Sequence, residues 1–162
     1  MRILLALMGV VVAGGGCASD APVDVAGSYT VATTNGANGC QFPNWTQGAT
    51  ATGIALTVGQ TGSDFNAVIG GVTGVFVDLW LGSHTFIGTV AGTNLHAGLA
   101  GERDQMPGTC KYRVNATMDG TLLGDALTGT IDLTTAIVTA ASDCPPPDCH
   151  SIIAFNGTRP PR

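Results

Sequence analysis

The sequence predicts an all-β protein, an antiparallel up-and-down meander of about eight or nine strands that forms a small closed or nearly closed barrel. The first observation is composition: only 10% of the 162 residues are charged, 24 are Gly, and Lys111 and Glu102 are the only Lys and Glu. Long helices need Glu and Lys on their exposed faces, so a helical bundle is excluded. The other two observations are the alternation of apolar with polar residues and the turn-forming residues between alternating segments.

The alternating segments predict the strands one by one. Residues 111–118 and 127–134 alternate over a full strand length, and the apolar positions of the first run from Tyr112 to Met118. Shorter segments alternate at Tyr29/Val31, Ile54/Leu56/Val58, Phe65/Ala67/Ile69, Val75/Val77/Leu79 and Ile153/Phe155. No segment has a convincing helical period, so a strand is also expected at 75–79. Closure into a barrel would remove the free edges of such a meander.

Two segments resemble each other and predict hairpins. GTVAGTNLHAG (88–98) and GTLLGDALTGT (120–130) align with Gly-Thr, then Gly, then Leu in step. Turn residues fall at Thr93-Asn94 in the first segment and at Gly124-Asp125 in the second. Two copies are too few for a solenoid or a propeller, so we interpret them as a structural repeat.

The first predicted strand opens with Gly27-Ser28-Tyr29. A Gly-x-aromatic motif at this place in a small exported barrel resembles the calycin-like group of lipocalins and avidins. The resemblance extends over about residues 25–158. It implies an up-and-down barrel whose interior is filled by side chains or holds one small ligand. It transfers no ligand residue to this chain.

Residues 1–16 have the layout of a bacterial export signal. Arg2 precedes an apolar stretch from Ile3 to Ala13, which is too short to span a bilayer, and small residues then lead directly into Cys17. This arrangement resembles the lipobox of bacterial lipoproteins, which implies that Cys17 is lipidated. No Asp follows the Cys directly, and in the enteric lipoprotein pattern this implies the outer membrane. An ordinary secretory signal, with Cys17 free or paired, is the alternative.

The rest of the chain divides into a tether, residues 17–24, and a single β-barrel domain, residues 25–162, because no linker or change in composition interrupts it. The segment between the Cys and the first strand would reach roughly 25 Å when extended, so the domain would lie close to the membrane. The net charge of −5 leaves no basic surface for nucleic acid or anionic lipid. The expected membrane contact is therefore the lipid itself.

Four cysteines remain once Cys17 is assigned to lipid, an even number that fits two disulfides in an oxidising compartment. A zinc site fits poorly, because Cys144 and Cys149 are separated by four residues, three of them Pro, and no second close pair accompanies them. We predict a Cys144–Cys149 disulfide that closes the proline loop and a Cys40–Cys110 disulfide that ties a long loop to the clearest strand. Cys40–Cys144 with Cys110–Cys149 is the alternative.

The search for catalytic or metal-binding groups predicts a protein that is not an enzyme and has no metal or cofactor. His84, His96 and His150 lack metal-ligand spacing, and no nucleophile elbow, P-loop or dinucleotide-binding fingerprint is present. Glu102-Arg103-Asp104 is the densest cluster of charge. Its two carboxylates could perform acid–base chemistry, but the simpler interpretation is a solvated ion pair in a loop.

Four aromatic residues are the candidate ligand-binding residues. Phe42 and Trp45 lie in a polar loop just after Cys40, whereas Phe76 and Trp80 lie on a predicted strand, opposite its Val and Leu residues. A strand that is apolar on both faces is either buried on both or meets a partner or ligand. We therefore expect the loop to fold over Phe76 and Trp80 as a lid held by Cys40, or the aromatic residues to form an exposed patch. The lid and the exposed patch can occur together at the open end of a barrel.

Together these expectations describe an exported, lipid-anchored, non-catalytic module of the outer membrane that binds a small apolar ligand or an envelope partner. The alternative is a structural envelope lipoprotein with a filled core, and a hydrolase assembled from distant residues is a further one. An apolar cavity of roughly 300 Å³ or more inside the barrel would favour a ligand carrier. A core without such a cavity would exclude a ligand carrier.

Overall fold

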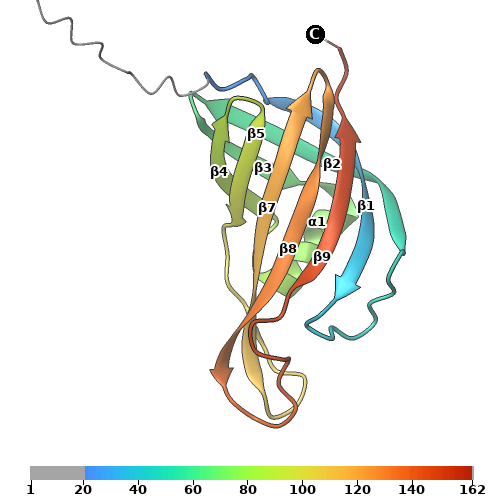
Figure 1. The fold of residues 1–162 in the computed structure, drawn as a ribbon, viewed down its shortest axis with the longest axis vertical. Helices are drawn as coiled ribbons and strands as arrows, with labels where there is room; N and C mark the ends of the chain where they lie inside the picture. Colours follow the sequence, from blue (N-terminus) through green and yellow to red (C-terminus); the bar gives the residue numbers. More distant parts are fainter. Residues whose placement is uncertain (1–20, 162) are drawn as a thin grey trace, which may run out of the picture.

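Nine strands and one helix make up the fold of residues 21–161, the part of the chain that the computed structural model describes (Figure 1). The predicted export signal, residues 1–16, and the predicted lipidation site, Cys17, lie outside these described residues. The elements are β1 (Gly27–Asn38), β2 (Thr50–Thr61), β3 (Asp64–Ile69), α1 (Gly71–Leu81), β4 (Thr85–Ala91), β5 (Asn94–Leu99), β6 (Asp104–Gln105), β7 (Lys111–Leu123), β8 (Ala126–Thr139) and β9 (Ser151–Thr158).

The sheet closes on itself. Its strand order is β5-β4-β3-β2-β1-β9-β8-β7-β6, every neighbouring pair is antiparallel, and β5 also pairs with β7. Eight strands therefore form a closed barrel, and β6 is a short extra strand beside the first residues of β7. The predicted all-β antiparallel meander is confirmed. The eight-stranded barrel is compatible with the calycin-like fold, whose opening motif Gly27-Ser28-Tyr29 resembles.

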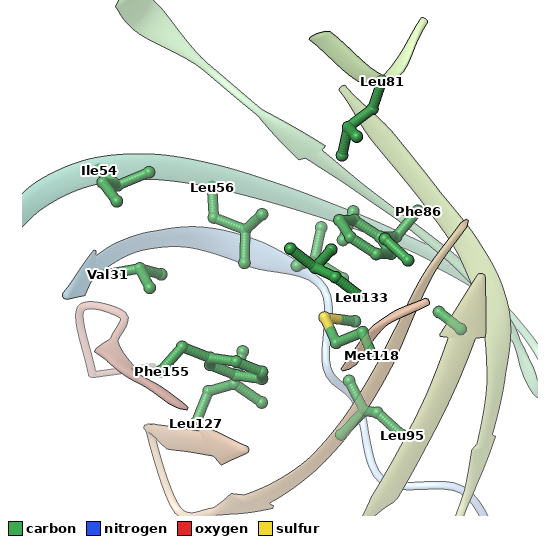
Figure 2. Close-up of a cluster of buried hydrophobic side chains, with 14 of the residues drawn as sticks. Val31, Ile54, Leu56, Leu81, Phe86, Leu95, Met118, Leu127, Leu133 and Phe155 are labelled. Carbon is green, nitrogen blue, oxygen red and sulfur yellow. The ribbon is translucent and has the colours of Figure 1, made fainter. Parts of the chain in front are cut away.

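Inward-facing apolar side chains fill the barrel interior (Figure 2). The alternation on β7 is confirmed, because its apolar positions from Tyr112 to Met118 are all at most 5% exposed. On β8, Leu127 and Leu133 are each 1% exposed. Figure 2 shows Phe155 of β9 beside Leu127, so the strands that close the barrel also share its core.

Three hairpins have two-residue turns with Gly in the first position. The turns are Gly62-Ser63, Gly92-Thr93 and Gly124-Asp125, and each Gly has a φ between 55° and 62°. Gly at this position suits a type II′ turn, whose twist matches that of the strands. The predicted turn of the 120–130 hairpin is confirmed, whereas that of the 88–98 hairpin lies one residue earlier than Thr93-Asn94.

The N-terminal segment crosses the end of the barrel that carries these hairpin turns. Its Val23 N–H donates to the Gly92 carbonyl, and its Val25 N–H donates to the Gln60 side chain. Val25 is 1% exposed, so it plugs this end. The Arg159 guanidinium, near the C-terminus, donates to the carbonyls of Asp24 and Ala26. In Figure 1 the chain therefore enters and leaves the barrel at the same end.

The strand predicted at 75–79 is wrong: these residues belong to α1, which caps the opposite end of the barrel (Figure 1). The helix ends at Gly82, which has a left-handed backbone (φ 81°) and donates its N–H to the Asp78 carbonyl. An apolar run of this length fits a buried strand and a helix equally well, so alternation alone could not distinguish them. Among the described residues, no helix is long and apolar enough to cross a membrane.

The predicted disulfide pairing is also wrong. Cys40 pairs with Cys149 and Cys110 pairs with Cys144, at Cα–Cα distances of 4.8 and 5.1 Å. The reason is strand pairing: the end of β1 lies beside the start of β9, and the start of β7 lies beside the end of β8. Each disulfide therefore joins the ends of two neighbouring antiparallel strands. Two disulfides are compatible with an exported protein.

An exposed ion network holds β6 against β7. Asp104 accepts hydrogen bonds from Lys111 Nζ and Arg113 Nε, each at 2.7 Å, and Glu102 accepts one from Arg113 Nη1 at 2.8 Å. The cluster predicted around Glu102 and Asp104 is thus a set of surface ion pairs, with Arg113 as the shared cation. Nearby, the Thr109 hydroxyl and backbone N–H donate to Asp143.

These contacts predict how stability depends on pH. Hydrogen bonds from Lys111 and Arg113 hold the pKa of Asp104 below its ordinary value, and those from Thr109 lower the pKa of Asp143. A lowered pKa in the folded state means that the unfolded chain binds protons first, so this stabilisation is present above about pH 4 and is lost as the pH falls through the lowered values. The urea midpoint should therefore fall between about pH 6 and pH 3. Asp104→Asn should flatten that slope, and an unchanged slope would contradict the assignment.

Candidate ligand-binding site

Two of the hollows at the α1 end of the barrel are candidate ligand sites. The first is a cavity of about 160 Å³, lined in part by Thr73 and Val77 of α1 and by Ile153 and Phe155 of β9. Its other lining residues are Val31, Thr33, Ile54, Leu56, Ile69, Phe86, Met118 and Ile131. This volume is about that of a cavity that accepts benzene and is smaller than the roughly 300 Å³ of an ordinary ligand pocket. This cavity is therefore smaller than the one expected for a ligand carrier.

The second hollow is a surface cleft of about 610 Å³, within the range of ordinary ligand sites. Three of the four predicted aromatic residues line it: Phe42, Trp45 and Trp80. The other lining residues are Asn35, Pro43, Asn44, Gln105, Met106, Pro107, Tyr112 and Ile153. They come from β1, the loop after it, α1, β6 and its following loop, β7 and β9. We call this hollow the aromatic cleft.

The loop between β1 and β2 is positioned by its own polar groups. The Asn38 side chain accepts a hydrogen bond from the Phe42 N–H and donates one to the Phe42 carbonyl, both at 2.9 Å. The Trp45 indole N–H donates to the Gly36 carbonyl at 3.0 Å. The Cys40–Cys149 disulfide ties the start of the loop to the start of β9. These contacts hold the two aromatic side chains of the loop at the cleft.

Phe42 brings the loop into contact with α1. Its ring lies edge-on to the Trp80 ring, with centroids 5.5 Å apart and an angle of 86° between the planes, and 6.3 Å from the Trp45 ring. This edge-to-face geometry is favourable for aromatic pairs. Phe42 is buried, whereas both Trp residues pack only partly against the core. The loop thus covers Trp80, on one side of the cleft.

Phe76 does not join this cluster, contrary to the expected lid over both Phe76 and Trp80. Phe76 and Trp80 are four residues apart on α1 and so are neighbours on the helix surface, but only Trp80 packs against the core. Phe76 is 66% exposed and lies with Val72, Val75 and Leu79 in an exposed apolar stripe on α1. Their spacing of three and four residues marks one helix face. The stripe is directed away from the residues of α1 that line the two hollows.

The lining of the aromatic cleft contains no charged residue among the residues that the structure describes. Burial raises the pKa of the Tyr112 phenol, so this hydroxyl stays neutral at physiological pH. The polar groups of the lining are the amides of Asn35, Asn44 and Gln105. A cleft of neutral amides and aromatic rings suits a neutral ligand that has both apolar and hydrogen-bonding surfaces.

No protein-family model matches the chain, and the curated proteins and the solved structures contain no significantly similar protein. Function is therefore inferred from the geometry of the site.

The three histidines lie outside the cleft lining, and each contacts an Asp through Nδ1. His84 is 3.4 Å from Asp78, His96 is 2.6 Å from Asp119, and His150 is 2.7 Å from Asp132. In residues 21–161, no group of three or more His, Cys, Asp or Glu side chains is arranged to hold a metal ion. The three pairs lie on different strands and loops, so they do not combine into one site.

Most of the polar lining is not predictable from local patterns. No motif marks Asn35 or Gln105 as a binding residue, and the alternation of residues 111–118 predicts only that Tyr112 faces the core. Gln105 donates its side-chain N–H to the Trp80 carbonyl, which connects β6 to the end of α1. Only a closed barrel brings these positions together, so no local signal could have identified them.

Proposed function

We propose that this chain is a non-catalytic binding module, exported and lipid-anchored to the outer membrane, whose ligand or partner binds in the aromatic cleft. The observation that carries this proposal is the convergence of Phe42, Trp45 and Trp80 on one cleft of ligand-site size. Aromatic residues provide a large contact area with little conformational freedom to lose, and Trp and Tyr are enriched in binding sites. The absence of charged groups from the described lining supports binding over acid–base chemistry.

Intrinsic fluorescence provides a direct test, because the chain has only two Trp and both line the cleft. A ligand in the cleft should change the polarity around Trp45 and Trp80 and so shift or quench their emission in a saturable manner. Trp80→Ala should weaken binding by at least tenfold, about 1.4 kcal/mol, because it removes one aromatic wall. The measurement is a fluorescence titration with the molecules that co-purify with the native protein, identified by mass spectrometry.

Phe76→Ala is the matched control, since Phe76 is an exposed aromatic residue of the same helix that does not line the cleft. Its titration should equal that of the wild type. If no co-purifying molecule changes the emission, or if Phe76→Ala weakens binding as much as Trp80→Ala does, the aromatic cleft is not the binding site. The alternative of a structural envelope lipoprotein would then be favoured by the small interior cavity.

The proposed anchor is tested by Cys17→Ala. The lipobox-like run before Cys17 supports lipidation of its thiol, and the two disulfides are compatible with export. Without the thiol, the protein should carry no lipid and should leave the outer-membrane fraction, as cell fractionation and intact mass spectrometry would show. A wild-type mature chain that begins at another residue and carries no lipid would exclude the anchor.

A further inference from the structure

The side chains that line the aromatic cleft indicate which class of ligand it binds. Two partly buried indoles, Trp45 and Trp80, stand with the amides of Asn35, Asn44 and Gln105. An indole offers a flat apolar face, and a primary amide offers both a donor and an acceptor. The lining therefore suits a ligand in which flat apolar faces alternate with groups that both donate and accept hydrogen bonds.

All three amides keep hydrogen-bonding groups that are available to a ligand. Within residues 21–161, the side chains of Asn35 and Asn44 make no hydrogen bond, and the Gln105 amide uses its N–H on the Trp80 carbonyl, which leaves its oxygen as an acceptor. Asn38 provides the contrast, because its amide is engaged on both sides by the Phe42 backbone. The polar groups that line the cleft are thus distinct from those that hold its loop.

We propose that the aromatic cleft binds a neutral glycan, with pyranose rings against the indoles of Trp45 and Trp80 and hydroxyl groups on the amides of Asn35, Asn44 and Gln105. A pyranose ring has an apolar C–H face, which packs on an aromatic ring through weak C–H contacts, and a rim of hydroxyls that both donate and accept. The inference rests on the proposed binding function and specifies its ligand.

Other ligand classes fit the lining less well. A purely apolar ligand would bury the amides without hydrogen-bond partners, which is unfavourable. A charged polymer would find no opposite charge in the described lining. A proline-rich peptide could accept hydrogen bonds from the amide N–H groups of Asn35 and Asn44, but its prolines have no backbone N–H to donate to the amide oxygens.

The position of the cleft suits a polymer. The N-terminal segment from Val23 to Ala26 crosses one end of the barrel, whereas the aromatic cleft lies at the other, where β1 ends and β7 begins (Figure 1). A chain anchored through its N-terminus would therefore present the cleft away from its anchor. Met106 lines the cleft and is 70% exposed, so this side of the cleft is accessible from solvent.

The test is a tryptophan-fluorescence titration of the full chain in detergent with three neutral tetrasaccharides: β-1,4-linked N-acetylglucosamine, β-1,4-linked glucose and α-1,4-linked glucose. At least one should change the emission saturably. Asn35→Ala should weaken that binding at least fivefold and Trp80→Ala at least tenfold, with Phe76→Ala as the unchanged control. Asn35→Ala keeps the fold testable, because its side chain makes no hydrogen bond within the described residues.

Two outcomes would overturn the inference: no response to any tetrasaccharide, or a response that survives both Asn35→Ala and Trp80→Ala. The co-purification titration separates this failure from that of the proposed function. If co-purifying molecules other than glycans shift the emission, the cleft is a binding site and only the glycan assignment is wrong. If neither set of molecules does, both proposals fail.

Discussion

Replacing Cys40 and Cys149 together by Ala is expected to lower the free energy of unfolding by roughly 5 kcal/mol in the chain-entropy model of disulfides. The two residues are 109 positions apart, so their bond removes much of the freedom of the unfolded chain. Both are also buried, at 1% and 6% exposed, where Ala leaves a small void. The measurement is urea unfolding of the oxidised protein at 25 °C, with the midpoint and slope reported separately.

The second disulfide provides the matched control. Cys110 and Cys144 are 34 positions apart, so replacing both by Ala should cost roughly 4 kcal/mol, about 1 kcal/mol less on the same model. Non-reducing peptide mapping of the wild type should join the peptide of Cys40 to that of Cys149. A peptide that carries Cys144 linked to Cys149 would contradict the structure, as would a loss below about 2 kcal/mol in the Cys40/Cys149 variant.

Phe155→Ala is expected to lower the free energy of unfolding by about 3–5 kcal/mol, the usual cost of removing a buried aromatic ring. Phe155 is 6% exposed and borders the interior cavity, so its removal enlarges an existing void. Its ring also covers Gly129: a Cβ at Gly129 would lie 2.6 Å from the ring atom Cζ. An aromatic side chain over a strand glycine protects backbone that would otherwise be uncovered.

Phe76→Ala makes the same chemical change at an exposed position. Phe76 is 66% exposed on α1, so little burial is lost, and Ala has the higher helix propensity. We expect the free energy of unfolding to change by less than about 0.5 kcal/mol. Urea unfolding of Phe155→Ala and Phe76→Ala in parallel tests whether Phe155 is buried and Phe76 is exposed. Equal losses would mean that α1 buries the face carrying Phe76, and that the stripe with Val72, Val75 and Leu79 is not exposed.

The barrel and the cleft depend on different parts of the chain. Hairpin turns and the N-terminal segment close one end, where Val25 is buried and Arg159 joins the two termini. The other end carries the longer connections, including α1, the loop after β1 and the segment after β6. Binding residues commonly lie on such loops, which a rigid scaffold positions. Both disulfides are at this end, so they stabilise the loops that form the cleft.

The strands could be predicted from the sequence because the signal is local. Alternation along residues 111–118 requires only that one face of a strand be buried, and Gly124-Asp125 between two such segments requires a tight turn. The same reasoning failed at α1, since the run from Val72 to Leu81 is mostly apolar and fits a buried strand as well as a helix. There the helix depends on what surrounds it: Val77 covers the barrel interior and Trp80 meets the loop.

The sequence by itself determined the alternating strands outside α1, the Gly124-Asp125 turn and the number of cysteines available for pairing. Tertiary structure alone decided which cysteines pair, because Cys40 meets Cys149 only when β1 and β9 become neighbours. The tertiary structure also decided the aromatic cleft. There Phe42 of the loop after β1 contacts Trp80 of α1, and Tyr112 of β7 also lines the cleft. The local alternation of apolar and polar residues indicates on which face of a strand each side chain lies. Contacts between distant segments depend on the register and closure of the whole sheet, which no short window of sequence contains.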